Sequence, residues 1–180
     1  MAVSLSVYDP SESYKNQKAF DCGHKVINDF VARSLKQQTQ RSLSVAYVLT
    51  DEDNLFIGFC TLMSASIVKA DLAATDPPSL PNAVPVTKLS MLGVALTHKR
   101  QGYGRRLLSH AIRITVQNAA TIGSYGLYLD AEDDAYDFYL KHTFVPLKDR
   151  QTPNPTPMFL PLQTARQAIA ASTPQAALFP

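Results

Sequence analysis

Long apolar stretches are missing from this sequence, and their absence limits the kind of protein it encodes. No segment approaches the ~18 consecutive apolar residues that span a bilayer, and the N-terminus MAVSLSVYDP lacks the basic start and apolar run of a signal peptide. Of the 180 residues, 46% are apolar and 18% are charged, so the chain is long enough to bury a real core. We therefore expect a globular cytoplasmic protein that does not use a membrane.

Cysteine is also scarce, because Cys22 and Cys60 are the only two in the chain. They can form at most one bridge, and so low a count favours a reducing compartment over a disulfide framework. Metal centres need several Cys or His ligands at short spacings, and only Cys22 and His24 lie close together in the sequence. We expect no bound metal.

Acidic residues are absent between residues 91 and 128, although that segment carries five Lys or Arg residues. The first fifty residues are also basic, with six Lys or Arg against four Asp or Glu. The formal net charge of +2 hides this uneven distribution. Two interpretations remain open: the basic segments are solvated faces, or they hold a ligand rich in phosphate.

Hydrophobic periodicity predicts an alternation of strands and helices, which is typical of a mixed α/β domain. Residues 104–120 place their apolar side chains on one helical stripe, and residues 20–35 do so less regularly, with Asp21 as the expected N-cap. Residues 69–85 contain four prolines and predict an exposed loop. We expect one domain over residues 1–162 and a poorly ordered tail over residues 163–180. The expected strands are 3–7, 44–50, 55–67, 87–94, 125–129, 144–147 and 158–162, and a further short helix is expected at 134–142.

The strongest local signal is the junction LGVALTHKRQGYGRR over residues 92–106, a strand followed by a basic turn with two glycines and then a helix. The first amides of a helix have no intrahelical acceptor and carry partial positive charge, so such a turn suits a pyrophosphate. An ordinary tight connection with a solvated basic end explains the glycines equally well. Two other phosphate loops are excluded, because GxxxxGK[ST] is absent and Leu107 occupies the third glycine position of GxGxxG.

The run KRQGYGRRLL resembles the acetyl-CoA-binding motif [Q/R]-x-x-G-x-[G/A] of the GCN5-related N-acetyltransferases, the GNAT family. Lys99 stands where the family usually has Gln or Arg, and Gly102 and Gly104 match the motif. The resemblance implies the GNAT fold, a mixed central sheet of about six or seven strands flanked by about four helices. It implies acetyl-CoA as donor and no metal. The implied acetyl-CoA-binding residues are Leu92, Gly93, Val94, Lys99, Arg100, Gln101, Gly102, Tyr103, Gly104 and Arg105.

Further segments look like one branch of that family, the acetyltransferase toxins of bacterial toxin–antitoxin pairs. They are FDCG at residues 20–23, YV at 47–48, VPV at 84–86 and DFYLKHTF at 137–144, and the similarity extends over about residues 7–162. This branch implies acetylation of the amino acid on charged tRNA, which blocks translation. It also implies a homodimer and an antitoxin with a ribbon-helix-helix DNA-binding part. A small-amine or peptide acetyltransferase, or a catalytically silent acyl-CoA-binding module, is the alternative.

Acetyl transfer to an amine requires a neutral amine, a stabilised oxyanion and a proton for the departing thiolate. An α-amino group has a pKa of ~7.7 to 8.0, so a strong general base is unnecessary. Backbone amides of residues 92–94 are the expected oxyanion donors. By resemblance Tyr139 is the general acid, whereas the residues alone favour packing beside Phe138 and Phe144; Tyr136 is the second candidate. The expected RNA-binding residues are Arg33, Lys36, Arg41 and Lys88.

Overall fold

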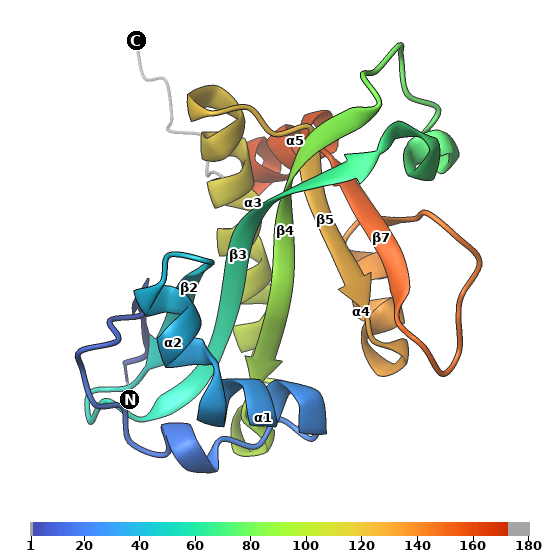
Figure 1. The fold of residues 1–180 in the computed structure, drawn as a ribbon. Coiled ribbons are helices and arrows are strands. Elements are labelled where there is room, and N and C mark those ends of the chain that lie inside the picture. The colour runs from blue at the N-terminus through green and yellow to red at the C-terminus, as the bar shows by residue number, and fades with distance from the viewer. Residues whose placement is uncertain (1, 173–180) are drawn as a thin grey trace, which may run out of the picture. The chain divides into compact units, whose positions relative to one another are not determined.

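The computed structural model describes residues 2–172 and contains a seven-stranded mixed sheet with five α-helices in that range (Figure 1). The strand order is β1-β2-β3-β4-β5-β7-β6. The strands are β1 (Ser4–Val7), β2 (Val45–Thr50), β3 (Phe56–Val68), β4 (Ala83–Val94), β5 (Gly126–Ala131), β6 (Val145–Pro146) and β7 (Thr156–Pro161). The helices are α1 (Lys25–Arg33), α2 (Leu35–Gln40), α3 (Tyr103–Thr121), α4 (Tyr136–Lys141) and α5 (Leu162–Ser172). The expected fold class is confirmed.

The described chain divides into two compact units. Residues up to Ser64, together with Lys88–Ala111, form the first unit; Ala65–Thr87, together with the residues from Ile112 onward, form the second. The long strands β3 and β4, which run side by side in Figure 1, and the helix α3 contribute residues to both units. The single domain over residues 1–162 stays a prediction.

The first unit is built on an antiparallel meander of β1, β2 and β3. The strands expected at residues 44–50 and 55–67 are confirmed as β2 and β3, which pair as an antiparallel hairpin with Tyr47 opposite Cys60 and an irregularity between Leu49 and Thr50. The predicted first helix is divided, because α1 ends at Arg33 and α2 begins at Leu35. The core of this unit is aromatic. It comprises Tyr8, Tyr14, Phe20, Cys22, Val31, Leu35, Ala46, Val48, Phe56 and Phe59.

The second unit pairs β5 with β7 and β7 with β6, all antiparallel. The expectation of an exposed loop over residues 69–85 is confirmed for residues 76–82 and wrong for residues 69–75 and 83–85, of which the latter begin β4. Lys69–Thr75 form a 3-10 helix, and Leu72 is fully buried in a cluster that includes Val84 and Phe159. Burial of the Leu72 side chain away from water stabilises this segment, whose composition is otherwise typical of a loop.

The expected poorly ordered tail is wrong for residues 163–172, which belong to α5. Ala165 is fully buried, and the amide of Leu162 donates a hydrogen bond to the carbonyl of Tyr125 at 3.1 Å. Residues 173–180 lie outside the described range. None of the described helices has the length and apolar character needed to cross a bilayer.

Candidate functional site

The turn between β4 and α3 is held at its start by two backbone hydrogen bonds within the first unit. Ala95 donates to the carbonyl of Ile57 at 2.8 Å, and Leu96 donates to the carbonyl of Asp21 at 2.9 Å. A short 3-10 helix, Leu96–His98, follows β4. These bonds tie the chain to β3 and to the segment before α1, so its direction on leaving the sheet is set before the basic residues begin.

The glycine-rich part of the turn presents backbone amides that have no partner. Arg100 and Gly102 have positive φ angles of 61° and 83°, and the first intrahelical bond at this end runs from the Arg106 amide to the Gly102 carbonyl at 3.0 Å. Within residues 2–172 the amides of Gly102–Arg105 have no acceptor. Unpaired donors at the N-terminus of a nineteen-residue helix are the geometry that binds an anion such as a pyrophosphate.

The side chains around the turn divide into two groups. Lys99, Arg100, Gln101 and Arg105 are exposed, whereas the Arg106 guanidinium donates to the carbonyl of Val3 at 2.7 Å and so supports the fold. The predicted binding residues 99–105 are contiguous, and Leu92, Gly93 and Val94 lie directly before them at the end of β4. The structure thus brings this set together in the first unit.

Gly93 and Gly102 are needed for different reasons. A Cβ atom on Gly93 would lie 3.0 Å from Ile27 Cγ2 and 3.3 Å from Phe59, so glycine allows α1 to approach β4 closely. Gly102 has open space around its Cα, with nothing in the described chain within 4 Å of an added Cβ. Its requirement is the positive φ, which L-residues with branched side chains adopt only with strain.

The segment before α1 is ordered by a polar network that corrects the expected role of Asp21. The N-cap is His24 and not Asp21. The Asp21 carboxylate accepts hydrogen bonds from the Gly23 amide at 2.8 Å and from the Asn28 side chain at 2.7 Å. These two bonds, with a smaller contribution from Lys99, hold the Asp21 pKa below its ordinary value. Lys99 therefore extends toward this segment, and its Nζ lies 3.6 Å from the site of a Gly23 Cβ.

Cys22 has a structural role in the same network. It is buried, its amide donates to Asn28 Oδ1 at 2.9 Å, and its thiol lies 3.2 Å from the same oxygen. Burial raises the pKa of the Cys22 thiol, which disfavours the reactive thiolate. Cys22 therefore fits the role of shaping the entry to α1.

Tyr139, the expected general acid, lies on α4 in the second unit. Its side chain is 7% exposed and packs edge-on against Phe138 and Phe144, with ring centroids 5.2 Å and 5.5 Å away. Thr143 follows with φ 66°, so it adopts the left-handed conformation despite lacking the freedom of glycine. The packing of Tyr139 agrees with the interpretation from the residues alone, and its role as acid stays a prediction.

Tyr136, the second candidate, and His142 at the end of α4 both have structural partners. The Arg150 guanidinium stacks over the Tyr136 ring at 4.7 Å from its centroid. The His142 ring Nδ1 lies 2.7 Å from the carbonyl of Phe138, at the C-terminal cap of α4. Both arrangements stabilise the end of a short helix.

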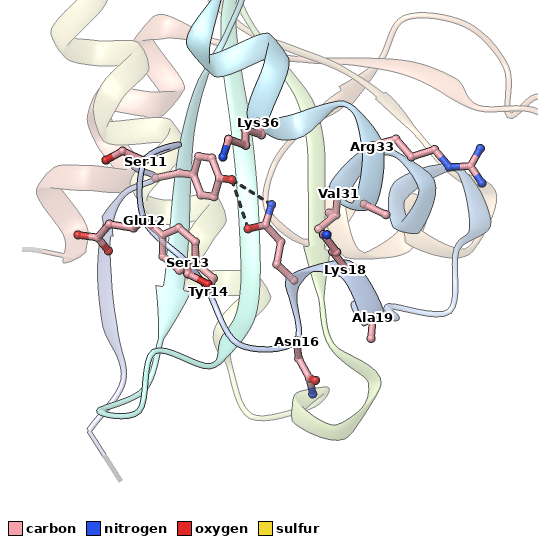
Figure 2. Close-up of a pocket in the computed structure, with 13 residues that line it drawn as sticks. Ser11, Glu12, Ser13, Tyr14, Asn16, Lys18, Ala19, Val31, Arg33 and Lys36 are labelled. Atoms are coloured by element: carbon pink, nitrogen blue, oxygen red, sulfur yellow. Dashed lines mark hydrogen bonds between the residues drawn. The ribbon is translucent and has the colours of Figure 1, made fainter.

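The predicted RNA-binding residues lie at three places in the first unit. Arg33 and Lys36 line a pocket of about 560 Å³ together with residues of the segment 8–19 (Figure 2). Arg41 caps the C-terminus of α2, and Lys88 is half-buried on β4. Sequence reasoning missed Lys18, which lines the same pocket, because no periodic pattern links it to the helix residues.

Comparisons with known proteins agree with this geometry. The model of the family described as the Acetyltransferase (GNAT) family matches residues 14–144. The chain is 31% identical over 127 residues to a tRNA-acetylating toxin of Mycobacterium tuberculosis (strain ATCC 25618 / H37Rv), covering 70% of this chain and 76% of that protein. It is 26% identical over 175 residues to a probable toxin TacT of Sinorhizobium fredii (strain NBRC 101917 / NGR234), covering 91% and 94%.

Solved structures share the fold. A crystal structure described as that of a bacterial toxin superposes with a TM-score of 0.90 at 32% identity, covering 94% of this chain and 96% of the other. AtaT complexed with acetyl-methionyl-tRNAfMet has a TM-score of 0.80 at 22% identity, covering 93% and 99%. A mutant AtaT bound to the C-terminus of the antitoxin AtaR and to acetyl-CoA has a TM-score of 0.77 at 20% identity, covering 94% and 99%.

Proposed function

Because the chain belongs to the GNAT acetyltransferase family, in the toxin branch related to the tRNA-acetylating toxins, we propose that it transfers the acetyl group of acetyl-CoA to the α-amine of an aminoacyl-tRNA and thereby blocks translation. GNAT enzymes are acetyl-CoA-dependent N-acetyltransferases. The observation that carries the proposal is the row of unpaired amides over residues 102–105 at the start of α3. The relatives named as toxins supply the class of acceptor.

The residues of the turn act on the donor. The amides of Gly102–Arg105 bind the pyrophosphate, and the exposed cations Lys99, Arg100 and Arg105 add favourable charge. In this proposal, backbone donors of Leu92–Val94 stabilise the oxyanion that develops on the thioester carbonyl. Backbone donors of residues 92–94 and 102–105, which lie close together in the sequence, thus face the negative charge of the transition state and that of the donor.

The transfer itself needs one nucleophile and one acid. The neutral α-amine attacks the thioester carbon, a C–N bond forms and the C–S bond breaks. In the tetrahedral intermediate the attacking nitrogen carries a positive charge and loses one proton to the solvent. As the C–S bond breaks, Tyr139 gives its phenolic proton to the departing sulfur, and it afterwards regains a proton from the solvent. Because an α-amine has a pKa of ~7.7 to 8.0, an appreciable fraction is neutral at cellular pH without a dedicated base.

The proposal extends to the partners of the chain. Solved relatives include a toxin bound to its antitoxin and one complexed with an acetylated tRNA. We extend both kinds of interaction to this chain, with an antitoxin that carries a ribbon-helix-helix DNA-binding part, a homodimeric toxin and a cytoplasmic site of action.

A labelling experiment tests the function. The purified chain is incubated with ¹⁴C-acetyl-CoA and a total pool of charged tRNA, and the label is expected on RNA and in an acetyl-amino acid released by mild alkali. Uncharged tRNA is the control and is expected to stay unlabelled, because it lacks the α-amine. If the folded, acetyl-CoA-binding protein labels no charged tRNA but acetylates free amines or peptides, the small-amine alternative replaces this proposal.

A further inference from the structure

The pocket at the C-terminal end of α1 has an excess of positive charge. Its lining includes Lys18, Arg33 and Lys36, and among the described residues that line it Glu12 is the single carboxylate. Three cations against one carboxylate leave a formal charge of +2. The charged side-chain groups of these three residues form no hydrogen bond or ion pair with any residue in the range 2–172. In Figure 2 the Arg33 guanidinium extends away from the other labelled residues. The charges of this pocket are therefore available to an anion.

The inner wall of the pocket supplies hydrogen-bond donors. Tyr14 is 8% exposed, and its hydroxyl oxygen accepts the Asp9 amide at 2.9 Å, which leaves its proton for another acceptor. The Gln17 amide group is held against the Tyr8 hydroxyl by hydrogen bonds of 2.9 Å and 3.2 Å, drawn dashed in Figure 2. One N–H of that amide remains for a ligand. These groups are fixed before a ligand arrives, because the Tyr8 and Tyr14 rings stack in the core at 5.0 Å.

We propose that this pocket binds one nucleotide of the charged tRNA, with a phosphate between the ammonium groups of Lys18 and Lys36 and hydrogen-bonding edges against Tyr14 and Gln17. The inference rests on the proposed function for the identity of the RNA. The cavity of about 560 Å³ lies within the range of small-ligand sites. Apart from the Tyr8 and Tyr14 rings, the apolar residues in its lining are Ala19, Ala32 and the buried Val31. Such a lining offers little aliphatic surface to the apolar face of a partner helix.

The position of the pocket in the first unit agrees with this ligand. The carbonyl of Asp21, which lies just before α1, accepts a hydrogen bond from the amide of Leu96 in the turn between β4 and α3. The pocket lies at the other end of α1. The nine residues of α1 rise by ~12 Å from first to last. This length is short compared with the single-stranded end of a tRNA, so an RNA strand that reaches the turn can also occupy the pocket.

The test compares two double variants that lose the same charge. Lys18→Gln/Lys36→Gln changes the pocket, whereas Lys15→Gln/Lys25→Gln removes two exposed lysines that pair with Asp53 and Asp29. The probe is a fluorescein-labelled single-stranded RNA that ends in CCA and carries no amino acid, titrated at several salt concentrations. We expect the pocket variant to bind it at least about 10-fold more weakly. The slope of log K against log salt is expected to fall in magnitude by about 0.7 in total, because the two lysines together neutralise one phosphate. The control is expected to bind like the wild type.

Two further readouts separate this inference from the proposed function. Thermal unfolding and the acetyl-CoA affinity are expected to be unchanged in the pocket variant, and its KM for charged tRNA is expected to rise with kcat retained. Weak RNA binding by the wild type, equal loss in both variants, or an unchanged pocket variant overturns the inference. A pocket variant that keeps its RNA affinity but loses its complex with a co-expressed antitoxin also overturns it. RNA binding through the pocket without any acetylation of tRNA supports the inference and refutes the function.

Discussion

Replacement of Gly102 by valine tests the cofactor turn most directly, because the chain contains a matched control for the backbone strain. Gly102 and Gly123 have φ angles of 83° and 86°, and in the described chain nothing lies within 4 Å of a Cβ built on either residue. Gly123 follows the C-terminus of α3, where its amide donates to the Asn118 carbonyl at 3.0 Å. Gly102→Val and Gly123→Val thus introduce the same conformational penalty at opposite ends of one helix.

The expected magnitudes differ between stability and binding. A left-handed conformation costs an L-residue roughly 1–2 kcal/mol, which for a chain of this size lowers Tm by about 2 to 8 °C, and we expect this in both variants. Only Gly102→Val also displaces an anion from the amides of residues 102–105. A hydrogen bond to a charged group contributes about 1.5–3 kcal/mol, so the loss of one weakens acetyl-CoA binding about 10- to 100-fold.

Calorimetric titration of acetyl-CoA into each variant measures the difference, and thermal unfolding reports the shared strain. We expect Gly123→Val to bind acetyl-CoA with wild-type affinity. Wild-type affinity in a folded Gly102→Val protein would refute the assignment of the turn. An equal loss of affinity in both variants would also refute it, because the effect would then come from strain in α3 alone. Should Gly102→Val fail to fold, Gly102→Ala repeats the test with a smaller side chain.

Tyr139→Phe is expected to retain Tm and acetyl-CoA affinity but to lower kcat by roughly 10²- to 10⁴-fold; full activity would reduce the tyrosine to its packing contacts with the neighbouring rings. Burial raises the pKa of Cys60 to about 12 and also raises that of Cys22, so iodoacetamide at pH 8 is expected to label the native protein slowly and the urea-unfolded chain rapidly at both thiols. Rapid labelling of the native protein would contradict that burial. The hydrogen bonds from Arg150 and Thr152 hold the Asp133 pKa below its ordinary value, so their stabilisation is present above the unfolded pKa of ~3.9 and is lost as pH falls through the folded pKa. Arg150→Gln is therefore expected to lower the urea midpoint at pH 7 and to have a smaller effect at acid pH, once the Asp133 carboxylate is protonated, and a difference independent of pH would contradict this linkage.

Several elements were predictable because their signals are local. The apolar stripe predicted a helix over residues 104–120, and α3 extends from Tyr103 to Thr121. The alternating β-branched and aromatic residues predicted the hairpin of β2 and β3. The two glycines after a strand predicted the turn at residues 99–105, since its conformation depends on φ angles that few other residues adopt.

Other elements escaped because their stability depends on distant residues. Leu72 lies in a segment rich in proline and small polar residues, yet its burial against Val84 and Phe159 orders that segment. The first turn of α5 is similarly fixed by the carbonyl of Tyr125. The spacing of Leu162, Ala165 and Ile169 is the helical signal that the composition of the tail concealed.

The sequence by itself determined the turn between β4 and α3, since unpaired amides at a helix start follow from the order of strand, glycines and helix. It also determined the fold class, through the succession of periodic segments. Only the tertiary structure decided which charges share a pocket. Lys18 joins Arg33 and Lys36 at one pocket, and Asp21 binds Asn28 instead of capping α1. These associations depend on how segments pack across the core, which fixes distances between residues that no local window of sequence relates.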